Sequence, residues 1–205
     1  MKTPNLGFFA SGRGTNMQAV VDACNSGMLA AKPVVVISNS SDSEALARAR
    51  REKIPAYHFS SKTHSDPFQL DDTILAALQL HRTDLVILAG YLKRLGEKTL
   101  AAFQGRVINI HPALLPKHGG AGMYGVHVHE AVIAAGDRET GVTIHLVDRE
   151  FDHGEILAQC RVPVMEGDTA ETLAARVLVK EHTFLVETLQ RIIDGEIVLP
   201  IQKDF

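Results

Sequence analysis

The chain has 205 residues, of which 45% are hydrophobic and 22% charged, and a formal net charge of −3 at pH 7. These values are typical of a soluble globular protein with an ample core, and they argue against bulk binding of nucleic acid. Cys24 and Cys160 lie far apart without metal-ligand spacing, the N-terminus lacks a signal-peptide pattern, and no apolar run could span a bilayer. We therefore expect a cytoplasmic protein with no membrane or nucleic-acid partner.

Apolar runs alternate with helical segments through the first hundred residues. The expected strands cover residues 6–10, 34–38, 54–59 and 85–89. The expected helices begin near residues 15, 42, 66 and 96. Because such alternation is typical of parallel βαβ units, we predict an α/β fold: an open, mostly parallel twisted sheet with helices on both faces and a Rossmann-like N-terminal half.

A glycine-rich turn, Ser-Gly-Arg-Gly-Thr-Asn at residues 11–16, separates the first strand from the first helix. Gly12 and Gly14 permit a tight turn, and Thr15 or Asn16 can cap the helix. Exposed N–H groups and the helix dipole favour an anion there. The turn lacks the glycine spacing of a dinucleotide site and the Gly-Lys-Ser/Thr of a nucleotide P-loop, so it predicts a site for a single phosphate. A plain tight turn is the alternative.

The second half changes character. It contains a strand at 107–110, a glycine-rich loop at 117–125, a helix at 126–135, strands at 140–147 and 155–164, and a last helix from 168 to 195. Asp168 and Glu171 are spaced like a capping box at the start of that helix.

Asn109 and His111 are two apart on the strand at 107–110, so both project to the same face. Together they can polarise a carbonyl and move a proton. Ligands of such sheets bind beyond the carboxyl ends of the strands. The glycine turn, residues 90–95 and His111 all fall at such ends, which predicts one shared site.

Three carboxylates, Asp148, Glu150 and Asp152, lie in one polar loop and could pair with His111. A carboxylate beside an imidazole raises the pKa of the imidazole, but the residue types alone do not select one of the three. His127 and His129 could ligate a metal from a strand, yet their surroundings predict a helix, on which positions two apart diverge. We therefore expect no metal.

The string Asn-Ile-His-Pro-Ala-Leu-Leu-Pro at residues 109–116 resembles the signature of the folate-dependent formyltransferases, and among them of the phosphoribosylglycinamide formyltransferases. Similar matches occur at residues 11–16, 90–95, 141–145 and 181–182, so the resemblance runs from about residue 6 to residue 194. It implies the formyltransferase fold as a single domain over 1–205. Residues 1–100 would form the nucleotide- or phosphate-binding half and 101–205 the catalytic and folate-binding half.

The resemblance also implies roles for individual residues. The catalytic residues would be Asn109, His111 and Asp152, flanked by His145. The substrate phosphate would be bound by Arg13, Gly14, Thr15 and Asn16, and the glycinamide amine by Glu181. The folate would be bound by Leu92, Lys93, Arg94, Leu95, Asn109, Asp148 and Asp152. Two features depart from some family members: Leu178 stands where they have a phosphate-binding lysine, and residues 65–68 lack their arginine.

The implied reaction moves the formyl group of 10-formyltetrahydrofolate, a co-substrate, to the amine of 5′-phosphoribosylglycinamide in purine biosynthesis. A tetrahedral oxyanion would be stabilised by Asn109 and His111, and Asp152 would keep His111 protonated. The resemblance requires no metal and is compatible with a monomer or a homodimer. A formyltetrahydrofolate deformylase, a methionyl-tRNA formyltransferase and a non-catalytic ribonucleotide-phosphate sensor are the alternatives.

Overall fold

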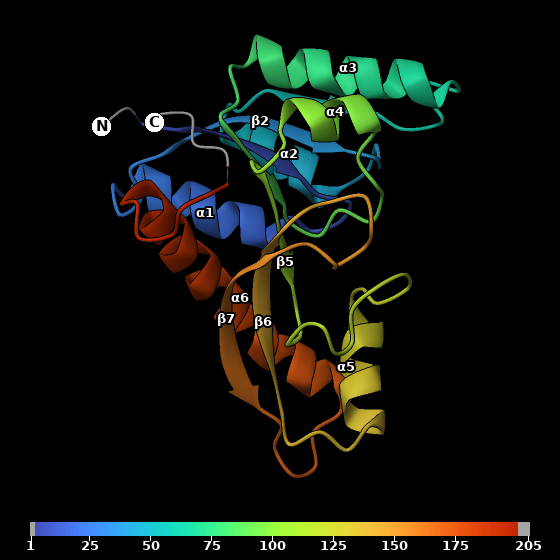
Figure 1. Ribbon diagram of the computed structural model, residues 1–205, viewed down its shortest axis with the longest axis vertical. Coiled ribbons are helices and arrows are strands. Elements are labelled where there is room, and N and C mark those ends of the chain that lie inside the picture. The colour runs from blue at the N-terminus through green and yellow to red at the C-terminus, as the bar shows by residue number, and fades with distance from the viewer. Residues whose placement is uncertain (1–2, 201–205) are drawn as a thin grey trace.

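Seven strands form one sheet in the order β3-β2-β1-β4-β5-β6-β7 in the computed structural model, which describes residues 3–200 (Figure 1). The strands are β1 Asn5–Phe9, β2 Lys32–Ser38, β3 Ala56–His58, β4 Leu85–Leu88, β5 Val107–His111, β6 Glu139–Leu146 and β7 Ile156–Pro163. The five strands from β3 to β5 are mutually parallel, whereas β6 and β7 are added antiparallel. This confirms the predicted mostly parallel sheet.

Helices cover both faces of the sheet, as predicted. They are α1 Thr15–Asn25, α2 Glu44–Arg51, α3 Pro67–Leu80, α4 Glu97–Ala102, α5 Val126–Ala134 and α6 Ala170–Ile193. Alternate strand residues supply the two cores. Phe8 packs with residues of α1, α2, α5 and α6, whereas Phe9 packs with residues of α3 and α4 on the other face. Figure 1 shows α3 and α4 on one side of the sheet and α1 and α6 on the other.

The order in which the parallel strands are added reverses between β1 and β4. From β1 the chain adds β2 and β3 on one side, and it then adds β4 and β5 on the other side. In open α/β sheets the ligand crevice lies at such a switch point, beyond the carboxyl ends of the strands. The two loops that leave these ends are joined here: Ser11 N donates to the Gly90 carbonyl at 2.9 Å, and Leu92 N donates to Ser11 Oγ at 2.8 Å. The glycine turn and residues 90–95 are therefore neighbours.

The turn after β5 is held by one buried hydroxyl. Thr143 Oγ1 donates to the Ala113 carbonyl at 2.6 Å and accepts from Leu115 N at 3.1 Å, and Gln159 Nε2 donates to the same oxygen at 2.9 Å. Because β6 pairs antiparallel with β5, Thr143 stands opposite His111. The antiparallel strands thus fix the position of His111 at the carboxyl end of β5.

Two predicted helix caps were wrong. Gly14, in the left-handed region at φ 67°, is the N-cap of α1, and no side chain caps that helix. Thr15 and Asn16 are its first two residues. The capping box of α6 is formed by Thr169 and Thr172. Asp168 lies outside that box and pairs with Arg176 at 2.6 Å.

No helix within residues 3–200 combines the length and apolarity that a membrane span requires. Residues 1–2 and 201–205, which the predicted domain includes, lie outside the described residues.

Candidate active site

A single cavity of about 1180 Å³ lies at the carboxyl ends of β1, β4 and β5. All of the residues to which the sequence assigned a role line it: Arg13, Gly14, Thr15, Asn16, Leu92, Lys93, Arg94, Leu95, Asn109, His111, His145, Asp148, Asp152 and Glu181. The predicted convergence of distant segments on one edge of the sheet is thus observed. The roles of these residues remain proposals.

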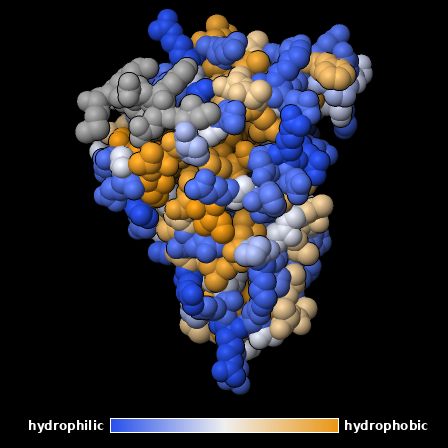
Figure 2. Space-filling model, viewed as in Figure 1, coloured by the Kyte–Doolittle hydropathy of each residue, from blue (hydrophilic) through white to orange (hydrophobic). Residues whose placement is uncertain are grey.

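The cavity has an apolar arm between the segment after β4 and the β6–β7 loop. Its lining there includes Leu92, Leu95, Leu100, Val147 and Phe151. The guanidinium carbon of Arg94 lies 4.6 Å from the centre of the Phe151 ring, so a cation–π contact joins the two segments. Figure 2 shows apolar side chains exposed in the middle of this face of the molecule, among hydrophilic ones.

At the opposite end, the glycine turn presents the uncapped first turn of α1 to the cavity. A Cβ on Gly14 would lie 2.7 Å from Cβ of Ala45, so α2 packs directly against the turn. Arg13 supplies a positive charge beside it, and its carbonyl accepts from Arg48 Nε at 2.9 Å. Leu178 of α6 also lines the cavity at this end. Orphan N–H groups and one guanidinium therefore provide the anion-binding capacity of this end.

A buried carboxyl lies next to this turn. Asn16 Nδ2 donates to Oε2 of Glu181 at 2.6 Å across α1 and α6. Burial raises the pKa of Glu181, and the Asn16 hydrogen bond and the charge of Arg13 oppose that rise only in part. A carboxyl in this state gains from the arrival of a cationic or hydrogen-bonding group such as an amine.

Asp152 is the carboxylate at the centre of the cavity. Its Oδ2 accepts from Gly120 N at 3.0 Å and lies 3.5 Å from Nδ1 of His111, while its Oδ1 accepts from Asn109 Nδ2 at 3.3 Å. Asp152 adopts a left-handed backbone with φ 55°. Gly154 then allows the chain to return to β7, because a Cβ there would collide with the carbonyl oxygen of Leu146.

Burial alone would raise the pKa of Asp152. The contacts with His145, His111 and Gly120 outweigh burial and lower it. Asp152 is therefore ionised at neutral pH. Asp148 lies in the same loop but pairs with His153 at 2.9 Å, and Glu150 is exposed. The structure thus selects Asp152 from the three carboxylates as the partner of His111.

Burial opposes the predicted effect of Asp152 on the protonation of His111. The ring is 3% exposed, and this burial lowers its pKa, with the charge of Asp152 and the His118 carbonyl opposing the shift. Nε2 donates to the His118 carbonyl at 2.8 Å, so the neutral ring keeps a lone pair on Nδ1, toward Asp152. The resting site therefore combines an anionic Asp152 with a neutral His111.

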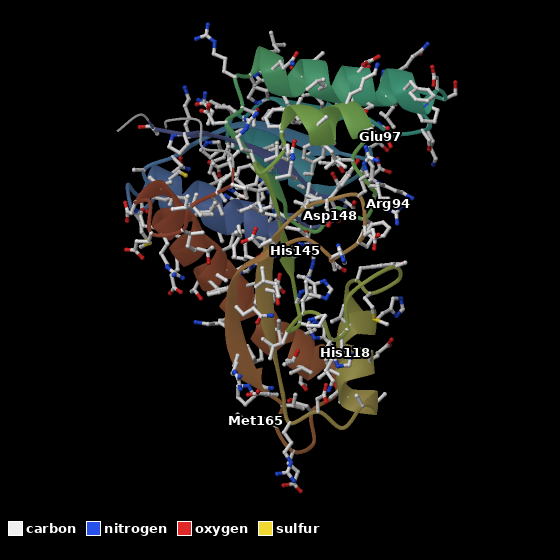
Figure 3. All side chains as sticks on the ribbon, viewed as in Figure 1. Arg94, Glu97, His118, His145, Asp148 and Met165 are labelled. Carbon is white, nitrogen blue, oxygen red and sulfur yellow. The ribbon has the colours of Figure 1, made fainter. Side chains whose placement is uncertain are left out.

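Asn109 and His145 stand opposite each other on β5 and β6. The amide Nδ2 of Asn109 lies 3.0 Å from Nε2 of His145. Figure 3 shows His145 and Asp148 in the middle of the molecule, whereas Met165 lies at the far tip beyond β7. His145, predicted as a flanking residue, thus contacts a predicted catalytic side chain directly.

Several lining residues were not predicted from the sequence. They are Met123, Tyr124, Val126 and His129 around the start of α5, and Glu171, Ala174 and Ala175 on α6. The α6 residues recur at spacings of three and four with Leu178 and Glu181, which is a helical face that the sequence pattern contains. His129 lies on a helix, as expected, and its pKa is lowered by burial and by His111.

No group of three or more His, Cys, Asp or Glu residues within residues 3–200 is arranged to hold a metal ion.

Comparison with known proteins places the chain in a family. Residues 5–189 match the formyl transferase family. A phosphoribosylglycinamide formyltransferase from Haemophilus influenzae is 40% identical over 92% of this chain and 87% of that protein. A chloroplastic phosphoribosylglycinamide formyltransferase from Vigna unguiculata is 42% identical over 97% of this chain, which spans 64% of the length of that relative.

The solved structures agree. Glycinamide ribonucleotide transformylase 1 from Symbiobacterium toebii superposes with a TM-score of 0.89 at 36% identity, covering 96% of this chain and 91% of that one. This chain belongs to the formyl transferase family. The relatives named above are phosphoribosylglycinamide formyltransferases or a glycinamide ribonucleotide transformylase, which are transferases, and this confirms the resemblance seen in the sequence.

The lowered pKa of His111 predicts a specific dependence of stability on pH. Between the ordinary histidine pKa of 6.5 and the lowered value, the unfolded chain binds a proton that the folded chain does not, so the free energy of unfolding should fall as the pH drops through this range. In His111→Asn this contribution is absent. The free energy of unfolding, measured in urea at about pH 7.5 and about pH 5.5, should therefore change less with pH in the variant, by at most about 1.4 kcal/mol per pH unit.

His153 provides the control, because Asp148 raises its pKa. Its stabilising contribution is present at low pH and is lost as the pH rises, which is opposite to the effect of His111. His153→Asn should therefore slightly steepen the rise of the free energy of unfolding with pH. Equal slopes for wild type and His111→Asn would contradict the neutral state of His111.

Proposed function

We propose that this chain transfers the formyl group of 10-formyltetrahydrofolate to the amine of 5′-phosphoribosylglycinamide. The observation that carries the proposal is the grouping of three features in one cavity. These are the anion-binding turn at residues 11–16, the buried carboxyl of Glu181, which suits an amine, and the apolar arm. The cluster of Asn109, His111 and Asp152 lines the same cavity. Membership of the formyl transferase family supports the same reaction.

Each end of the cavity suits one substrate. The N–H groups of Gly14, Thr15 and Asn16, with Arg13, would bind the ribose phosphate, and Glu181 would take the amine end. The apolar arm, bounded by residues 92–95 and Asp148, would take the flat ring of the folate, and Asn109 and Asp152 would contact its polar edge. The formyl carbon would then lie near Asp152, between the two substrates.

The proton transfers follow from the charges at rest. The amine nitrogen attacks the formyl carbon, and the resulting oxyanion accepts a hydrogen bond from the amide of Asn109. The lone pair on Nδ1 of His111 can accept the amine proton, directly or through water, and the imidazolium formed is stabilised by Asp152. The same proton then passes to the folate nitrogen as the carbon–nitrogen bond to folate breaks. No covalent enzyme intermediate is required.

The test mixes purified protein with 10-formyltetrahydrofolate and follows the absorbance of released folate. Release that depends on phosphoribosylglycinamide supports the transfer. Release without the ribonucleotide indicates deformylation and contradicts the proposal, as does ribonucleotide binding with no folate release in any mixture, the behaviour of a phosphate sensor.

Substitution of Gly14 should weaken binding of the ribonucleotide specifically. Gly14→Ala strains a left-handed residue and pushes the turn away from Ala45, which displaces the N–H groups proposed to bind phosphate. We expect KM for the ribonucleotide to rise about tenfold or more while KM for the folate changes little.

Gly27→Ala is the matched control. Gly27 has φ 78° and no atom within contact distance of the added methyl group, so this variant carries the same kind of backbone strain away from the cavity. Equal effects of the two substitutions on KM would mean that the phosphate is bound elsewhere.

The single continuous sheet supports one domain with the two halves described above, and a cytoplasmic monomer or homodimer belongs to the same proposal. Sedimentation of the full chain measures the oligomeric state.

A further inference from the structure

One ring nitrogen of His145 contacts the backbone of the next residue. The ring is 2% exposed, and Nδ1 lies 2.7 Å from the carbonyl oxygen of Leu146. A carbonyl oxygen can only accept a hydrogen bond, so Nδ1 carries a proton. In the neutral ring Nε2 therefore holds a lone pair, and it faces the amide of Asn109 at 3.0 Å.

This lone pair orients the amide of Asn109. Nδ2 has two acceptors on the same side, Nε2 of His145 at 3.0 Å and Oδ1 of Asp152 at 3.3 Å. These acceptors are only 3.5 Å apart, which is close enough for one N–H to be shared between them. The second N–H of the amide is then left for a ligand in the cavity that Asn109 lines.

We propose that His145 is a positioning residue that holds Asn109 with an amide N–H directed at the reacting carbonyl oxygen. The inference rests on the proposed function only in naming that oxygen as the formyl oxygen. A proton on Nε2 would face the N–H of Asn109 and force the amide to turn, which would present its oxygen to the cavity. The neutral Nδ1–H form of His145 is thus the form that supports catalysis.

Three variants of His145 separate positioning from packing. In His145→Gln the side-chain oxygen can replace Nε2 as the acceptor, whereas His145→Asn is too short to reach and His145→Ala has no acceptor. We expect kcat to fall about tenfold or more in the Ala and Asn variants, with KM for the ribonucleotide unchanged and with most of the activity kept in the Gln variant. Full activity in His145→Ala would overturn the proposal, as would equal losses in all three variants.

His127→Ala is the matched control, because His127 is an exposed histidine on α5 that does not itself line the cavity, although its ring contacts the lining residue Tyr124. It should match wild type in kcat and in thermal stability.

A double-mutant cycle tests whether the effect passes through Asn109. If His145 acts by orienting that amide, His145→Ala should cost no further activity in an Asn109→Ala background. Losses that multiply in the double variant would show that His145 acts by another route and would overturn the proposal.

A measurement without catalysis keeps the inference separate from the proposed function. Nitrogen-15 NMR of the full-length protein labelled in histidine reports which ring nitrogen of His145 carries the proton, with His145→Gln identifying the signal. The Nδ1–H form supports the proposal and the Nε2–H form overturns it. Failure of wild-type protein to release folate would instead contradict the proposed function, and the NMR result would still decide the state of His145.

Discussion

The rest of the site depends on one largely buried carboxylate, that of Asp152. It accepts hydrogen bonds from Gly120 N in the loop before α5 and from the Asn109 amide on β5, and it lies within 3.5 Å of His111 and His145. An ion in a buried position is stable only when such partners are present. The contacts of Asp152 with His145, His111 and Gly120 lower its pKa, so it keeps its charge, while burial lowers the pKa of His111. The chemistry proposed for the cavity follows from this distribution of charge.

Topology explains why the substrates can meet there. The parallel strands place the glycine turn and residues 90–95 on the two sides of the switch point between β1 and β4. The antiparallel addition of β6 brings Thr143 and His145 opposite His111 and Asn109, and it returns the chain to Asp152. The parallel half thus forms the two binding ends, and the antiparallel pair supports the reacting centre between them.

Much of this arrangement could be predicted from the sequence. The buried strands of a parallel sheet are continuous apolar runs, such as residues 85–89, and polar residues at their carboxyl ends predict the site edge. The helix caps were harder, because residue preference favours a side-chain cap at Thr15 over the uncapped left-handed Gly14. The lowered pKa of His111 could not be predicted. A sequence shows which carboxylates could lie nearby, but burial, which lowers this pKa, depends on the tertiary structure. The α6 face is partly apolar, and the pattern alone does not distinguish a cavity wall from core packing.

The central claim is that the specific position of Asp152, and not the negative charge of its loop, supports formyl transfer. Single-turnover transfer should be compared for Asp152→Asn and Glu150→Gln, which each remove one charge from the same loop, with substrate binding measured separately. The account predicts a loss of about a hundredfold or more in Asp152→Asn with substrates still bound, and a near wild-type rate in Glu150→Gln. Similar rates in the two variants would contradict it.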